Sequence, residues 1–120
     1  MRRLTTSIQR KFLNHDGLRI NYDVDYGEQK DKFLIFVHGL AGELSAFDAD
    51  RIILKEFGYS TIAFDQRGHG LSDRPKREES YSFENFALDV KDLIRHEGVR
   101  NFILIGHCFG GMVASLFAAK

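Results

Sequence analysis

The sequence contains one cysteine, one proline and no tryptophan among its 120 residues. Its 17 Lys and Arg residues equal its 17 Asp and Glu residues in number, so the formal net charge at pH 7 is zero. A balanced chain offers no electrostatic reason to bind nucleic acid or an anionic membrane, and we expect neither as a partner. A single cysteine excludes an internal disulfide, which fits a reducing cytoplasm and leaves the thiol to be explained by its chemistry.

Long apolar runs are also absent, since none approaches the roughly 20 residues of a membrane-spanning helix. No apolar stretch follows Arg2 and Arg3, so the sequence lacks the pattern of a secretory signal and we expect a cytoplasmic protein. Hydrophobic residues make up 43% of the chain and charged residues 28%, which is typical of a globular domain. We interpret residues 1–120 as one domain in which residues 1–9 are flexible.

Three short apolar runs without alternation predict strands that are covered on both faces, as in a parallel sheet. They lie at residues 33–37, 61–64 and 102–105. Residues 11–13 and 18–24 predict an earlier hairpin around Asp16-Gly17, with a charged loop at residues 27–32.

Helices are expected between these strands, at residues 45–57 and again between a capping Ser82 and a terminating Gly98. A third helix is expected to start near Gly110. This alternation of strands and helices predicts an α/β fold with a mainly parallel sheet.

The strand at residues 102–105 runs directly into Gly106-His107-Cys108-Phe109-Gly110-Gly111. A strand, a G-x-C-x-G-G turn and a helix place a nucleophile at the tip of a sharp turn. Gly106 and Gly110 remove side chains that would collide there, and Gly111 is expected to let the helix approach the sheet. The helix N-terminus favours the thiolate form of Cys108, which is the reactive form. The alternative is that Cys108 is a small buried side chain without a chemical role.

This turn follows two other motifs, FVHGLAG at residues 36–42 and DQRGHGLSD at residues 65–73. Together they resemble the N-terminal part of the α/β-hydrolase family, in the branch that holds esterases, lactonases, epoxide hydrolases, haloalkane dehalogenases and aminopeptidases. The resemblance covers residues 10–120. It implies a three-layer sandwich whose sheet has the order 1-2-4-3-5, mostly parallel with an antiparallel first strand. It also implies an oxyanion hole made by the backbone N–H groups of Leu40 and Phe109.

The resemblance assigns the histidines of these motifs to organising the site rather than to proton transfer. It implies that His38, His69 and His107 hold or shape loops, together with Gly39, and that residues 65–73 brace one another. We expect no cofactor and no metal, because the histidines and Cys108 show no ligand spacing. The glycines at 106, 110 and 111 match neither dinucleotide-binding nor Walker A spacing. Glu43 is a candidate lining residue that the sequence leaves open.

In this fold the nucleophile is followed along the chain by an acid and then a histidine, so we expect both beyond Lys120 and interpret the chain as a truncated domain. The strand at residues 102–105 is then an apolar edge that favours self-association. Three hypotheses remain. The first is a hydrolase that cleaves an ester, thioester or lactone bond of a small molecule through Cys108. The others are an inactive scaffold that binds a partner, and a half-enzyme completed by another chain.

Overall fold

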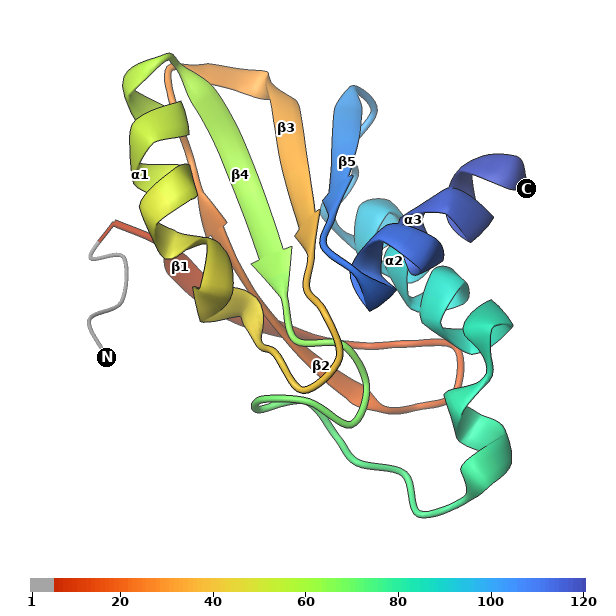
Figure 1. Ribbon diagram of the computed structural model, residues 1–120. Helices are drawn as coiled ribbons and strands as arrows, with labels where there is room; N and C mark the ends of the chain where they lie inside the picture. The colour runs from red at the N-terminus through yellow and green to blue at the C-terminus, as the bar shows by residue number, and fades with distance from the viewer. Residues whose placement is uncertain (1–5) are drawn as a thin grey trace.

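A computed structural model describes residues 6–120, in which five strands form one sheet in the order β1-β2-β4-β3-β5 (Figure 1). The strands are β1 (Ile8–Leu13), β2 (Arg19–Asp25), β3 (Gln29–Val37), β4 (Tyr59–Phe64) and β5 (Phe102–Gly106). β3 pairs in parallel with β4 and with β5, whereas β2 is antiparallel to both β1 and β4. The expected strand order is confirmed, and β2 is the strand that runs against the other four.

Helices cover both faces of this sheet, which confirms the three-layer sandwich (Figure 1). α1 (Asp48–Glu56) follows the short 3-10 helix η1 (Leu44–Phe47) and lies on one face. α2 (Phe83–Glu97) and α3 (Phe109–Ala119) lie on the other, and η2 (Glu78–Tyr81) leads into α2. The helix expected at residues 45–57 is therefore divided between η1 and α1.

Two apolar cores lie on opposite faces of the sheet. The larger one packs against α2 and α3 and includes Ile35, Val37, Phe64, Val90, Leu93 and Val113. The smaller one lies under α1 and includes Leu34, Phe36, Leu44, Phe47 and Ala63. Successive side chains of a strand point to opposite faces, so β3 sends residues alternately into both cores. This double coverage is why residues 33–37 are apolar without alternation.

The ends of the strands differ from the sequence prediction. β3 begins at Gln29, so residues 29–32, predicted as part of a charged loop, belong to a strand whose side chains there are exposed. β1 begins at Ile8, where it pairs with Val24 of β2, so the flexibility expected of residues 1–9 does not apply to Ile8 and Gln9. Residues 1–5 lie outside the described residues.

The predicted boundaries of α2 are confirmed. The Ser82 hydroxyl accepts a hydrogen bond from the N–H of Asn85 at 3.2 Å, and Gly98 ends the helix in a left-handed conformation with φ 69°. Within residues 6–120, no helix combines the length and the apolar character that a membrane crossing requires.

Candidate active site

Cys108 stands at the junction of β5 and α3 with φ 52° and ψ −116°. Within residues 6–120 only one other non-glycine residue, Ala41, has a positive φ. A backbone of this kind costs about 1–3 kcal/mol and persists only where its surroundings fix it. The Cys108 side chain is exposed, as the nucleophile-turn interpretation requires, and the alternative of a buried cysteine is wrong for these residues.

Two glycines make the turn sterically feasible. A Cβ at Gly106 would lie 2.5 Å from the carbonyl oxygen of Gly110. A Cβ at Gly110 would clash with the carbonyl oxygens of Val37 and His38 at the end of β3. A Cβ at Gly111 would only make ordinary contact, 3.5 Å from the carbonyl oxygen of Gly106. Gly110 is therefore the glycine that lets α3 approach the sheet, and the role expected of Gly111 is corrected.

The loop after β3 lies directly against this turn. A Cβ at Gly39 would lie 3.3 Å from the carbonyl oxygen of His107 and 3.7 Å from Cβ of Cys108. The N–H of Gly42 donates to the carbonyl oxygen of Gly39 at 3.0 Å, and Ala41 adopts φ 62° to close this four-residue turn. The predicted oxyanion loop and nucleophile turn are thus neighbours.

Leu40 and Phe109, the predicted oxyanion donors, both have free main-chain N–H groups. Phe109 is the first residue of α3, so its N–H has no acceptor within the helix. Within residues 6–120, neither the N–H of Phe109 nor that of Leu40 donates a hydrogen bond to another group. Leu40 as a residue is also 70% exposed.

His38 is fully buried, and both of its ring nitrogens are engaged by the backbone. Nδ1 lies 2.7 Å from the carbonyl oxygen of Gly39, which can only accept, and Nε2 lies 3.0 Å from the N–H of Gln66, which can only donate. The neutral ring with its proton on Nδ1 is the form that satisfies both partners. Burial, with the nearby His69, lowers the pKa of His38 and keeps it neutral. His38 therefore organises loops, as expected, and has no free nitrogen to act as a base.

His69 also connects the loop of residues 38–42 to the loop after β4. Its Nε2 accepts from the N–H of Ala41 at 3.1 Å, and its Nδ1 lies 3.0 Å from the carbonyl oxygen of Arg67. The rings of His38 and His69 have centroids 4.9 Å apart. Both histidines thus fix the loop of residues 38–42 to the loop after β4.

Asp65 ties three segments together, a role that the sequence gives only as bracing within residues 65–73. One carboxylate oxygen accepts from the N–H of Leu44 at 2.8 Å. The other accepts from the N–H of Leu71 at 2.9 Å and from the Asn21 side-chain amide at 3.0 Å. Asn21 is the site residue that sequence reasoning missed, because it is one of several polar residues in β2. Gln66 lies within the DQRGHGLSD motif and was expected only to take part in the bracing of residues 65–73.

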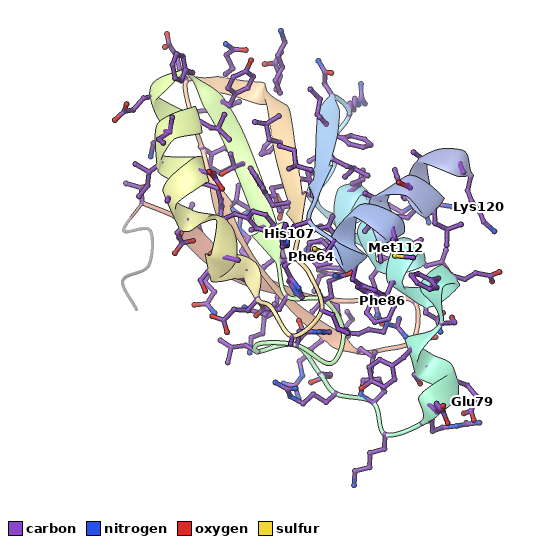
Figure 2. All side chains as sticks on the ribbon, in the orientation of Figure 1. Phe64, Glu79, Phe86, His107, Met112 and Lys120 are labelled. Atoms are coloured by element: carbon purple, nitrogen blue, oxygen red, sulfur yellow. The ribbon has the colours of Figure 1, made fainter. Side chains whose placement is uncertain are left out.

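His107 is the one residue within 6–120 whose side chain lies within hydrogen-bonding range of the thiol, with Nε2 3.7 Å from Sγ of Cys108. Figure 2 shows His107 at the carboxyl end of β5, where the chain turns into α3. It also lines a hollow of about 430 Å³ with the apolar side chains of Phe36, Phe47 and Ile105. His107 thus shapes the surface beside the thiol.

A larger cavity of about 890 Å³ is lined by the loops after β3 and β4 together with residues of β2. Residues 40–44 line it together with His69 and Arg74, so Glu43 does lie in a cavity wall, but Cys108 does not line it.

One group of potential metal ligands occurs within residues 6–120, away from the thiol. His15, Asp89 and Asp92 bring ligand atoms within 4.8 Å of one another. Both carboxylate oxygens of Asp89 already accept from the Arg67 guanidinium, at 2.7 and 2.8 Å. A cation there would face a guanidinium charge, so the donor set does not fit a metal.

The comparisons with known proteins agree with this geometry. Residues 32–120 match the α/β hydrolase fold family, and the chain belongs to that family. It is 36% identical over 110 residues to epoxide hydrolase 3 of Xenopus tropicalis, covering 90% of this chain and 29% of that protein. It is 39% identical over 87 residues to 2-(acetamidomethylene)succinate hydrolase of Mesorhizobium japonicum, covering 72% of this chain and 30% of that protein.

Among solved structures, epoxide hydrolase A of Mycobacterium thermoresistibile superposes with a TM-score of 0.83 at 28% identity. That match covers 94% of this chain and 35% of the solved chain. The chain therefore spans about a third or less of the length of these relatives.

Proposed function

We propose that the protein acts as a hydrolase on an ester, thioester or lactone bond of a small molecule, with Cys108 as nucleophile. The observation that carries this proposal is the strained, exposed Cys108 beside the unpaired N–H groups of two site residues. A nucleophile next to backbone donors suits reactions that build negative charge on a carbonyl oxygen.

The reaction then has two steps. The Cys108 thiolate attacks the carbonyl carbon, a C–S bond forms, and the carbonyl electrons move to oxygen, where the N–H groups of Leu40 and Phe109 stabilise the charge. Collapse of this intermediate breaks the bond from the carbonyl carbon to the leaving group, which is an alkoxide from an ester or lactone and a thiolate from a thioester. The leaving group takes a proton from water, and the acyl group stays on Cys108 as a thioester. Water hydrolyses the thioester to a carboxylic acid and returns the thiol.

The cysteine argues against epoxides as substrates, although several relatives are named epoxide hydrolases. A thiolate that opens an epoxide forms a C–S thioether. This product has no carbonyl carbon for water to attack, so the enzyme would be alkylated once and would not turn over. An acyl substrate instead gives a thioester that water can cleave.

The proposal also places the protein in a reducing compartment such as the cytoplasm, because Cys108 must stay a free thiol to react. Within residues 6–120 only His107 offers a side-chain group near Sγ. We therefore expect these residues alone to be acylated faster than they are deacylated, so that the acyl-enzyme accumulates.

Intact-mass spectrometry after exposure to p-nitrophenyl acetate tests the proposal. The wild-type protein should gain one acetyl group on Cys108, with a matching burst of p-nitrophenolate, and Cys108→Ala should gain none. Cys108→Ser is the matched control, because it keeps the side chain small and polar but removes the thiolate, and it should react far more slowly. Equal release of p-nitrophenolate by wild type and Cys108→Ala would refute the proposal.

A further inference from the structure

His107 and Cys108 are neighbours in the chain whose side chains meet at the end of β5. Nε2 of His107 lies 3.7 Å from Sγ of Cys108. Neighbouring side chains of a strand point to opposite faces, so this contact depends on the departure from strand geometry at Cys108, with φ 52° and ψ −116°. The N–H of His107 donates to the carbonyl oxygen of Val37 at 3.1 Å, and its carbonyl oxygen accepts from the N–H of Gly110 at 2.9 Å. The backbone that carries the ring is therefore held on both sides, by β3 and by α3.

His107 differs from the other two histidines of the site in the use of its ring nitrogens. Both nitrogens of His38 and both nitrogens of His69 are engaged by main-chain groups. Within residues 6–120, the thiol is the only group in hydrogen-bonding range of Nε2 of His107, and Nδ1 has no protein partner. His107 is exposed, so water can hydrogen-bond Nδ1. With its proton on Nδ1, the neutral ring presents the lone pair of Nε2 to the thiol.

We propose that His107 is a catalytic residue, which takes the proton of the Cys108 thiol at its Nε2. This inference rests on the proposed acyl transfer, and it goes beyond the loop-shaping role that the family resemblance implies for His107. The S–H bond breaks and an N–H bond forms, which leaves a thiolate beside an imidazolium, and the thiolate then attacks the carbonyl carbon. The ring later gives its proton to the hydroxide that remains when the leaving group takes a proton from water, so no net proton is gained or lost.

A cysteine at position 108 makes a single histidine sufficient for this step. A thiol is acidic enough to give its proton to an imidazole without a third group, and the N-terminus of α3 favours the resulting thiolate. A serine hydroxyl is a much weaker acid and needs an imidazole whose positive charge is stabilised by a carboxylate. Within residues 6–120, no carboxylate forms an ion pair or a hydrogen bond with the His107 ring. The ring is therefore matched to a thiol and not to a hydroxyl.

The surroundings of the ring contain little charge. His107 lines the hollow of about 430 Å³, and Asp50 of α1 is the one charged residue in that lining. The loop after β3 contributes Gly39, where a Cβ would lie 3.2 Å from Nδ1 of His107, and the first turn of α3 has no acidic residue. The Cys108 thiol is thus the titratable group in contact with the ring, and Asp50 is its charged neighbour across the hollow.

The pH profile of Cys108 alkylation by iodoacetamide tests the inference. In His107→Gln the alkylation rate at pH 7 should fall about tenfold or more, because the thiol has lost its base. At a pH above the ordinary range of thiol ionisation the thiol ionises without help, so the rates of the variant and the wild type should converge. Acetylation by p-nitrophenyl acetate should fall at pH 7 by the same factor, since both reactions need the thiolate. His96→Gln is the matched control. It removes an exposed histidine from the last turn of α2 and should leave both rates unchanged.

An unchanged alkylation rate of His107→Gln at pH 7 would overturn the inference, and so would an equal loss at every pH, which would show a structural role only. If His107→Gln does not fold, the ultraviolet absorbance of the wild-type thiolate decides, because Cys108 is the only thiol in the sequence. This absorbance should persist at a pH below the ordinary range of thiol ionisation, and a thiolate that forms only within that range overturns the inference. Wild type that is alkylated but never acetylated would instead overturn the proposed function, and this catalytic role with it.

Discussion

Arg67 and Asp89 form a buried, bidentate ion pair between the loop after β4 and helix α2. Nε and Nη2 of Arg67 donate to the two carboxylate oxygens of Asp89 at 2.7 and 2.8 Å. Asp89 also accepts from the Asn14 side-chain amide at 2.7 Å, and Arg67 also donates to the Ser80 carbonyl oxygen at 2.7 Å. The pair therefore joins the β1–β2 hairpin, α2 and the motif loop that holds the site.

Asp89→Asn should lower the free energy of unfolding by about 3–5 kcal/mol, because it leaves the Arg67 charge buried without its partner. Urea denaturation followed by circular dichroism measures the change. Glu79→Gln is the matched control. It removes a carboxylate from an ion pair with Arg77 in which both side chains are more than 70% exposed, and it should change stability little. Similar effects of the two substitutions would contradict the structural role of the buried pair.

Gly110→Ala should destabilise the protein by about 1–3 kcal/mol, because the added Cβ clashes with the end of β3 and pushes α3 away from the sheet. It should also slow acetylation of Cys108. Gly111→Ala adds the same atom one residue later, where there is space for it, and should be neutral or stabilising. Urea denaturation measures the stability of both variants, and the rate of Cys108 acetylation measures the effect on the site. A greater loss of stability in Gly111→Ala than in Gly110→Ala would contradict this prediction.

His15 should give a stability contribution that is present in acid and lost as the pH rises. Burial acts to lower the pKa of His15, but its hydrogen bonds with Asp92 and Asn85 and the charges of Asp16 and Asp89 raise it overall. A raised folded-state pKa means that the native protein binds the proton more tightly, so the contribution is complete below the unfolded value of about 6.5 and disappears above the folded value.

Denaturation midpoints of wild type and His15→Gln across this pH range test that contribution. The advantage of wild type should be largest in acid and should shrink as the pH rises through the folded-state pKa. Asp92→Asn removes the carboxylate charge 2.7 Å from Nδ1 of His15 and should weaken the pH dependence of stability. A stability advantage of wild type over His15→Gln that grows with pH would contradict a raised pKa of His15.

β5 is an edge strand of the sheet, and Ile103 on it is 62% exposed. Exposed apolar edges pair with other chains, so we expect residues 1–120 alone to self-associate through β5. Ile103→Lys should shift the protein toward monomer, because a charged side chain opposes edge pairing. Sedimentation velocity over a range of concentrations measures the change, with the exposed Leu13→Lys at the opposite edge strand as control. A monomeric wild-type chain would refute this expectation.

The sequence predicts the central strands and the nucleophile turn because their signals are local, whereas the strand order followed from the resemblance to the family. Doubly covered strands are continuous apolar runs, and the turn is six consecutive residues with glycines at fixed positions. Residues 29–32 escaped prediction because this part of β3 is exposed and polar, so hydrophobicity carries no strand signal there.

The polar connections of the site could not be predicted because they join residues far apart in the chain. His38 meets Gln66 across 28 positions, and Asn21 meets Asp65 across 44. The motifs mark each residue as polar beside a loop, but only the fold shows which partners meet. The sequence predicts that Gly110 must lack a side chain, but only the fold shows that a side chain there would clash with the end of β3.

The strained backbone at Cys108 is held by glycines and by the packing of α3 on β3, and these supports do not involve the sulfur atom. A change of the side chain to serine or aspartate would leave them in place. The attacking group is thus a part of the site that a single amino-acid substitution can exchange, while the glycines and the packing that hold the turn stay unchanged. A new nucleophile, and with it a different reaction, can therefore arise at position 108 while the protein keeps its fold throughout.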